Sequence, residues 1–207
     1  LQNYLLAPQE RFLPDGMIPM CYPSDNPDSV FIPNWSMWYV LELRNVLLRD
    51  GKSEIVEASR EKVLGIIEYF KNFENEFGLL ENLEKWVFIE WSHSKNFVKG
   101  INFPSNMLYS AMLSAASDLY NLPELKEKSD KLKKTILKFS YNGEFFIDQA
   151  IRENGEVVIT ENITETCQYY AFYFGIATRE SHPKLFKTLM EKFGAQRNIK
   201  KVYPNVY

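Results

Sequence analysis

The sequence predicts an all-α fold of paired helices, a partial (α/α) six-hairpin toroid with short β-hairpins at one rim. Two observations support this prediction. Three segments that are apolar on nearly every face alternate along the chain with three segments that have one polar face. The buried segments begin near positions 34, 105 and 164, and this uneven spacing excludes a regular helical repeat. We therefore expect inner helices that line a funnel and outer helices that shield them.

The first predicted pair of helices begins after Pro33, a residue that favours the first turn of a helix. Residues 34–49 are apolar on nearly every face, which is typical of a helix surrounded by protein. Gly51 ends this helix because glycine accepts a positive φ. The segment that follows has a charged side and one apolar stripe, made of Ile55, Val63, Ile66, Ile67, Phe70 and Phe73.

The same couplet recurs twice. Pro104 opens a buried segment rich in Met, Leu and Ala that runs to Leu119, and residues 124–138 then carry many lysines around a thin apolar stripe. The third pair comprises the aromatic-rich residues 164–174, closed by Gly175, and residues 183–193, closed by Gly194.

Short extended segments lie between the couplets. Residues 86–91, 144–148 and 156–160 have the composition of strands, and Glu153-Asn154-Gly155 is typical of a hairpin turn. We expect these strands to cap one end of the molecule. Because each buried helix opens with polar and aromatic residues, their first turns are expected to meet at that end and to favour a hydroxyl-rich or anionic ligand.

Composition excludes several classes of protein. The 207 residues are 45% hydrophobic with a formal net charge of −3, so the chain is long enough for a large core and fits one domain, residues 1–207. The basic residues are mixed with acids, which argues against nucleic acid as a partner. No stretch approaches the ~20 apolar residues of a membrane span. The start without Met indicates an incomplete segment of a longer protein.

No motif in the sequence points to a cofactor or a metal. The phosphate-binding and dinucleotide-binding glycine patterns and the Gly-x-Ser-x-Gly motif are missing, and His93 and His182 lack a paired ligand spacing. Cys21 and Cys167 are too few for a stapled secreted fold, so we interpret them as free thiols in apolar surroundings. We expect no cofactor.

The loop at residues 88–96 is the strongest candidate for chemistry. It puts the Glu90 carboxylate beside the Trp91 indole, and an indole face stacks on the C–H face of a pyranose ring. A neighbouring carboxylate holds sugar hydroxyls or, where it is desolvated, moves protons. The alternative is that Trp91 fills the core and Glu90 is a surface acid. Other candidates at the same rim are Asp25 in the loop 22–28, the helix-opening residues Asn34, Trp35 and Trp38, and Glu165; their alternatives are turn, cap and core roles.

Several of these segments together resemble the six-hairpin catalytic domain of bacterial α-L-rhamnosidases, glycoside hydrolase family 78. The resemblance rests on five short motifs in the right order: residues 15–19 (Asp-Gly-Met-Ile-Pro), 22–25 (Tyr-Pro-Ser-Asp), 32–39 (Ile-Pro-Asn-Trp-Ser-Met-Trp-Tyr), 88–92 (Phe-Ile-Glu-Trp-Ser) and 164–170 (Thr-Glu-Thr-Cys-Gln-Tyr-Tyr). They cover most of the chain.

The resemblance implies inverting hydrolysis of a terminal α-L-rhamnosyl bond by two carboxyl groups about 6.5–9.5 Å apart. The family's acid lies in an Arg-Glu-Arg-like stretch and its base in a later Trp-Glu stretch, and neither stretch occurs here in the corresponding place. The segment is therefore expected to supply the sugar-binding wall, without the acid and base, for a rhamnose-containing oligosaccharide or glycoside. By resemblance its substrate-binding residues are Asp25, Asn34, Trp35, Trp38, Glu90, Trp91 and Glu165.

Two alternatives stay open. One is a non-catalytic carbohydrate-binding or scaffold protein of the same fold, and the other is a glycosidase for another sugar, such as a glucuronide. Inner helices with an apolar face and no neighbour would also make the isolated chain prone to dimerise.

Overall fold

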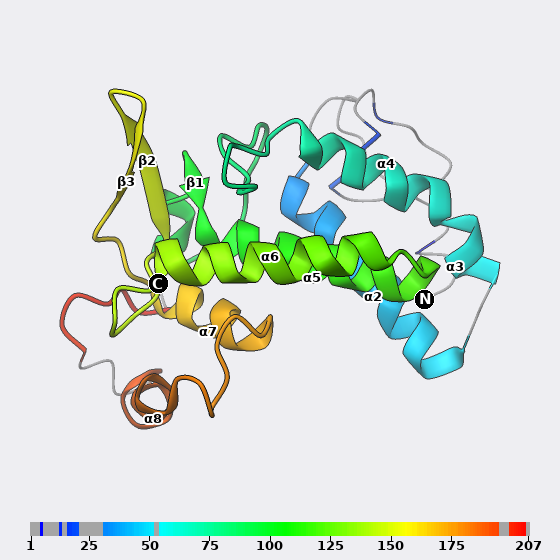
Figure 1. Ribbon diagram of the computed structural model, residues 1–207. Helices are drawn as coiled ribbons and strands as arrows, with labels where there is room; N and C mark the ends of the chain where they lie inside the picture. The colour runs from blue at the N-terminus through cyan, green and yellow to red at the C-terminus, as the bar shows by residue number, and fades with distance from the viewer. Residues whose placement is uncertain are drawn as a thin grey trace.

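The computed structural model describes residues 5, 13, 16–20, 31–51, 54–194 and 199–205. Most of this part of the chain is helical, with a small sheet near one end (Figure 1). Its elements, in chain order, are α2 (Pro33–Asp50), α3 (Glu54–Ala58), α4 (Arg60–Lys71), the 3-10 helix η2 (His93–Asn96), β1 (Ile101–Asn102), α5 (Phe103–Tyr120), α6 (Pro123–Ser140), β2 (Gln149–Glu153), β3 (Glu156–Ile159), α7 (Glu165–Tyr173) and α8 (Pro183–Lys192).

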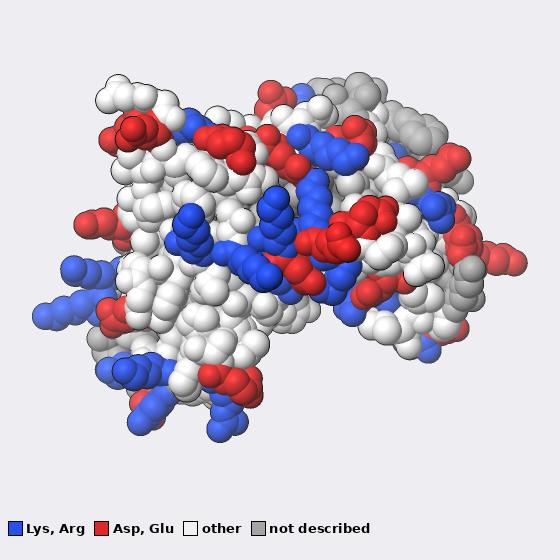
Figure 2. All heavy atoms as spheres, viewed as in Figure 1, with Lys and Arg blue, Asp and Glu red and all other residues white. Residues whose placement is uncertain are grey.

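The alternation of buried and exposed helices is confirmed. Helix α5 buries fourteen of its eighteen residues and packs against α2, α6 and α7. Helix α6 buries only Leu125, Ser129, Leu132, Ile136 and Ser140, whose spacing of three or four places them on one face. Close approach to α5 is possible there because Ser129 is small; its Oγ donates to the Ser110 carbonyl at 2.6 Å. The outer face of α6 carries mixed Lys, Asp and Glu side chains (Figure 2).

The first outer segment differs from the prediction of one continuous helix. It breaks at Ser59 into α3 and α4. The Ser59 hydroxyl donates to the Ile55 carbonyl at 2.7 Å and accepts from the Tyr39 hydroxyl at 3.1 Å. A serine that bonds back to the preceding turn favours a bend in a helix. The backbone bonds from the Ser59 N–H to the Ile55 carbonyl and from the Val63 N–H to the Ser59 carbonyl, both 3.0 Å, remain, so the interruption is slight.

The strand predictions are partly wrong. Strands β1, β2 and β3 form an antiparallel sheet in that order, with Ala150 opposite both Ile101 and Ile159. The predicted turn is confirmed, because Asn154 and Gly155 both have positive φ, as a two-residue hairpin turn requires. Residues 86–91, however, form no strand, and β2 begins at Gln149 rather than within 144–148.

A side chain explains why residues 144–148 do not form a strand. The Gln168 amide on α7 accepts from the Phe146 N–H at 2.8 Å and donates to the Phe146 carbonyl at 2.7 Å. These two bonds satisfy the backbone groups that a neighbouring strand would otherwise pair. A hydrophobic run that reads as a strand is therefore held as an irregular buried segment against a helix.

None of the described helices is both long and apolar enough to cross a membrane.

Candidate functional site

The first turns of α2, α5 and α7 meet at one end of the molecule, as the sequence predicts. Asn34 near the start of α2 donates its amide to the Ser105 hydroxyl near the start of α5, at 2.9 Å. Asp148 joins the other two helices. Its carbonyl accepts from the Phe103 N–H at 2.8 Å, and its carboxylate accepts from the Thr164 N–H and hydroxyl, both at 2.7 Å.

Residues 86–97 lie across this end of the helices and contact both α2 and α7. The Asn34 side-chain oxygen accepts from the Phe88 N–H at 3.0 Å. On the α7 side, the Tyr170 hydroxyl donates to the Ile89 carbonyl at 3.4 Å, and the hydroxyls of Ser92 and Thr166 are 3.3 Å apart. The loop thus has fixed contacts on two helices, which hold its side chains in place without regular secondary structure.

Four rings from this loop and from α2 form an exposed cluster, which we call the aromatic surface: Trp35, Trp86, Phe88 and Trp91. The ring centroids of Phe88 and Trp91 are 5.0 Å apart, those of Trp86 and Trp91 6.0 Å apart, and those of Trp35 and Phe88 6.3 Å apart. The three tryptophans are 41%, 44% and 51% exposed in chain order. Monomeric proteins rarely expose large apolar side chains together unless they bind something there.

Glu90 and Trp38 flank the aromatic surface and are linked through Tyr170. The Glu90 Oε1 atom accepts from the Trp91 N–H at 2.5 Å. Burial raises the pKa of Tyr170 to about 12, and the Glu90 carboxylate contributes in the same direction, whereas a hydrogen bond with Trp38 opposes it. The Tyr170 hydroxyl therefore stays protonated and acts as a donor at neutral pH.

Glu165 has a different environment from the other predicted site residues. Its side chain is 3% exposed, and its carboxylate accepts from the Asn205 N–H at 3.0 Å and the Gly194 N–H at 3.3 Å. Its own N–H donates to the Tyr203 carbonyl at 2.9 Å. Glu165 thus fastens the C-terminal segment to the start of α7. That segment returns to the loop, because the Tyr203 ring stacks on His93 at 4.8 Å.

Asp148 is the most perturbed carboxyl group of this region. It is fully buried, and burial raises its pKa to about 7 although both bonds from Thr164 favour the charged form. Burial also raises the pKa of the adjacent Cys167 thiol, and the Asp148 charge adds to that rise. Cys167 is a free buried thiol, as expected, whereas Cys21 lies outside the described residues.

The structure brings Trp35, Glu90 and Trp91 to one surface, with Trp38 joined to it through Tyr170. Asn34 is buried behind that surface and holds the loop, and Glu165 holds the C-terminal segment beside it. Asp25 lies outside the described residues.

Sequence reasoning did not single out Trp86, Phe88, Tyr170 or Asp148 as site residues. The density of aromatic residues between positions 86 and 91 was a usable signal for the first two. Tyr170 and Asp148 follow no pattern that marks them, since their importance depends on packing. Within the described ranges, no group of three or more His, Cys, Asp or Glu side chains is placed to hold a metal ion.

Comparisons with known proteins give a clear result for structure alone. No family model matches the sequence, and no curated protein matches it. Among solved structures, a family 78 rhamnosidase from Bacillus sp. GL1 superposes with a TM-score of 0.70 at 19% identity, over 86% of this chain and 18% of that one. A rhamnosidase from Klebsiella oxytoca with rhamnose bound gives 0.62 at 17% identity, over 87% of this chain and 35% of that one.

The chain therefore spans a minor part of the length of these proteins, 18% and 35% respectively. Over that part the backbone follows theirs closely enough to show a common fold. The resemblance that the five sequence motifs predicted is borne out at the level of structure: this chain has the fold of a segment of the rhamnosidases.

Proposed function

We propose that this chain is the central part of the catalytic domain of a glycoside hydrolase, a six-hairpin (α/α) toroid that removes terminal α-L-rhamnosyl residues with inversion. In this proposal the segment supplies the wall of the sugar site. One observation carries it: the aromatic surface, with the Glu90 carboxylate beside it, lies where the first turns of three helices meet. The shared fold with two rhamnosidases, one of which holds rhamnose, supports the substrate.

The aromatic surface has the chemistry that a deoxyhexose needs. A 6-deoxy sugar presents a methyl group and C–H faces, which pack against indole rings, together with hydroxyls, which need donors and acceptors. We assign Trp91 as the stacking platform, Trp35 or Trp38 as the wall, and Glu90 with Asp25 as acceptors for hydroxyls. Hydroxyls bonded in this way let a site reject sugars that lack them.

We assign neither Glu90 nor Glu165 as the acid or the base of the reaction. An inverting pair requires two carboxyl groups that face the bond from opposite sides, about 6.5–9.5 Å apart. Glu165 is buried and engaged by two backbone N–H groups, and Glu90 accepts from the adjacent Trp91 N–H. In our proposal the acid and the base come from other hairpins of the longer protein.

The engagement of both glutamates with backbone groups also favours a second candidate, a non-catalytic carbohydrate-binding protein of the same fold. Such a protein keeps the aromatic surface and needs no proton transfer. The two candidates differ in turnover and agree on binding, so one set of measurements separates them.

The test begins with the full-length protein and a panel of nitrophenyl glycosides that includes α-L-rhamnoside and a glucuronide. If NMR detects β-L-rhamnose as the first product released, the result supports an inverting rhamnosidase. Cleavage of another glycoside with the rhamnoside untouched overturns the substrate. Rhamnose binding in calorimetry without any turnover supports the binding protein instead.

Binding is localised with two variants. Trp91→Ala is expected to weaken rhamnose binding at least about tenfold, since stacking and area burial are both lost. Leu48→Ala is the control, because Leu48 is an apolar residue that is 69% exposed near the C-terminal end of α2, away from the first turns of the helices. Equal affinities of Trp91→Ala and the wild type would remove the aromatic surface from the proposal.

If the chain is part of a toroid, apolar surfaces that other hairpins of the longer protein cover are expected to be exposed here, and one such surface is present. A groove of about 600 Å³ lies between α7 and α8, lined by Trp38, Tyr169, Tyr170, Phe172, Tyr173, Phe186, Leu189 and Met190. Met190 is 72% exposed there. We expect the isolated 207-residue chain to dimerise through such surfaces, and light scattering measures this directly.

A further inference from the structure

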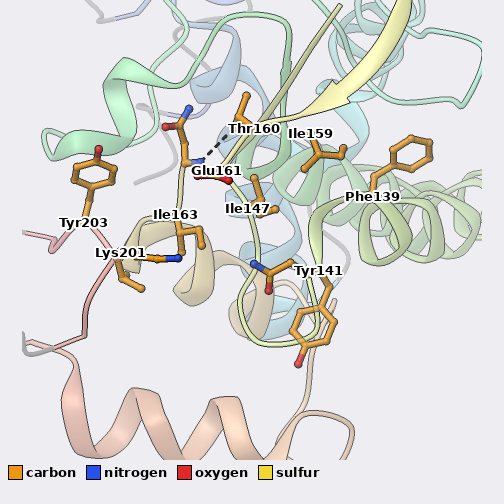
Figure 3. Close-up of a pocket in the computed structure, with 12 residues that line it drawn as sticks. Phe139, Tyr141, Ile147, Ile159, Thr160, Glu161, Ile163, Lys201 and Tyr203 are labelled. Atoms are coloured by element: carbon orange, nitrogen blue, oxygen red, sulfur yellow. Dashed lines mark hydrogen bonds between the residues drawn. The ribbon is translucent and has the colours of Figure 1, made fainter.

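A separate pocket of about 960 Å³ lies between the segment that follows β3 and the C-terminal segment. We call it the C-terminal pocket. Figure 3 shows Lys201 and Tyr203 on one side of it and Phe139 and Tyr141 on the other. Thr160, Glu161 and Asn162 line it between these two sides, and Ile147, Ile159 and Ile163 provide its apolar part.

The side chains of this pocket combine rings with hydrogen-bonding groups of both kinds. Three aromatic side chains offer apolar faces or edges, Lys201 offers an ammonium donor, and Glu161 offers a carboxylate acceptor. This mixture suits a saccharide, whose rings have C–H faces and whose hydroxyls both donate and accept. The volume lies at the upper end of the range of about 300–1,000 Å³ typical of ligand pockets, so the pocket accommodates at least one pyranose ring.

Tyr203 connects the C-terminal pocket to the loop that carries the aromatic surface. Its ring stacks on His93, two residues after Trp91, with the planes inclined at 28°. Its backbone is held on both sides, because its N–H donates to the Ile163 carbonyl at 2.8 Å and its carbonyl accepts from the Glu165 N–H at 2.9 Å. The ring is therefore in place before any ligand arrives, which lowers the entropic cost of binding.

Lys201 has a strained backbone. Its φ is +70°, in the left-handed region that disfavours side chains other than glycine, asparagine and aspartate. Glycine at this position would relieve the strain. Strain of this kind persists where the surrounding structure holds the backbone in place, and it is more frequent at functional sites. A glycine at position 201 would lack the ammonium group, which is the part of Lys201 that can bind a ligand in the pocket.

We propose that the C-terminal pocket is a second sugar-binding subsite, which holds the saccharide unit next to the one bound at the aromatic surface. Tyr203 is its platform, and Lys201 and Glu161 bond the hydroxyls of that unit. This inference rests on the proposed function, because it takes the aromatic surface as the site of the terminal sugar. It adds where the second unit of the oligosaccharide binds and which residues contact it.

The test compares two ligands on the full-length protein by titration calorimetry: L-rhamnose, and a disaccharide of α-L-rhamnose joined through sulfur to C6 of D-glucose, whose thioglycosidic bond resists hydrolysis by the proposed enzyme. We expect the disaccharide to bind about tenfold more tightly, as one or two additional hydrogen bonds to charged groups provide. Lys201→Ala is expected to remove most of that gain and to leave the affinity for L-rhamnose unchanged.

Lys201→Gly separates a binding role from a structural one. It removes the same amine and also relieves the backbone strain, so we expect Tm to rise by about 1–3 °C while the affinity for the disaccharide falls as in Lys201→Ala. Asn154→Gly is the matched control. Asn154 also has a positive φ, of 51°, but lies in the turn between β2 and β3, and its replacement should leave both affinities unchanged.

The outcomes distinguish the subsite from the function on which it rests. If L-rhamnose binds and depends on Trp91 while the disaccharide binds no more tightly, the subsite is overturned and the proposed function stands. Full disaccharide affinity in both Lys201 variants also overturns the subsite. If neither sugar binds the wild type, the proposed function is overturned, and the subsite that rests on it is overturned with it.

Discussion

Asp148 makes the stability of this protein depend on pH in a direction opposite to that of most carboxyl groups. Its side chain is fully buried, and burial raises its pKa from 3.8 to about 7. Between these two values the folded protein keeps the proton and the unfolded chain loses it. The stabilising contribution of this group to the folded state is therefore complete below about pH 4. It falls by about 1.4 kcal/mol per pH unit as the pH rises from there, and it is lost above pH 7.

The perturbation that tests this reasoning is Asp148→Asn, which keeps a side-chain acceptor and cannot ionise. Between pH 5 and pH 8 the wild type should lose about 3 kcal/mol from this group, because the unfolded chain is already ionised over most of that range. The variant should lose none of it. The stability of the variant relative to the wild type is then expected to grow by about 3 kcal/mol from pH 5 to pH 8.

The assay is urea unfolding followed by tryptophan fluorescence at each pH. His182 adds a pH dependence of the opposite sign: burial lowers its pKa, so its contribution to stability is lost as the pH falls. Because His182 is present in both proteins, the difference between them isolates Asp148. Asp118→Asn is the control, since Asp118 is an exposed partner of Arg44. A relative stability of Asp148→Asn that does not change with pH would refute the argument.

Two further changes test the contacts that shape the site. Asn34→Ala removes hydrogen bonds to the buried Ser105 hydroxyl and to the part-buried Phe88 N–H, and it should lower the free energy of unfolding by about 2–4 kcal/mol in urea; an effect within about 0.5 kcal/mol would show that the loop is not anchored there. Gly100→Ala places a Cβ atom 2.6 Å from the Ala150 carbonyl oxygen at a φ of +66°, whereas Gly78→Ala, at a φ of +75°, meets open space. The first should cost at least about 1 kcal/mol more than the second in thermal unfolding, and equal costs would contradict this.

The helices could be predicted well because their signals are local. The apolar pattern of residues 34–49, bounded by Pro33 and Gly51, predicts α2 to within one residue at each end. The single apolar face of α6 appears in the sequence as a stripe with the period of a helix. Asn154-Gly155 likewise specifies its turn, because both residues tolerate the positive φ that the turn requires.

The strands were predicted less well because pairing is not local. Residues 144–148 have strand composition, but the partner of Phe146 is the Gln168 amide, 22 positions further along the chain. Residues 86–91 are held in the same way by Asn34 and Tyr170. Composition indicates that a segment is buried and extended, and it does not indicate what satisfies its backbone.

The properties of the candidate site likewise fall into those set by local sequence and those set by tertiary packing. The sequence by itself determined that Glu90 and Trp91 share a loop, that the buried helices open with polar and aromatic residues, and that the fold resembles part of the rhamnosidases. Tertiary structure alone decided that Glu165 is buried against two backbone N–H groups and that Asp148 lies in a dry interior with a raised pKa. The physical reason is range: helix patterns and turns depend on residues a few positions apart, whereas desolvation and hydrogen-bond partners depend on which distant segments exclude water together.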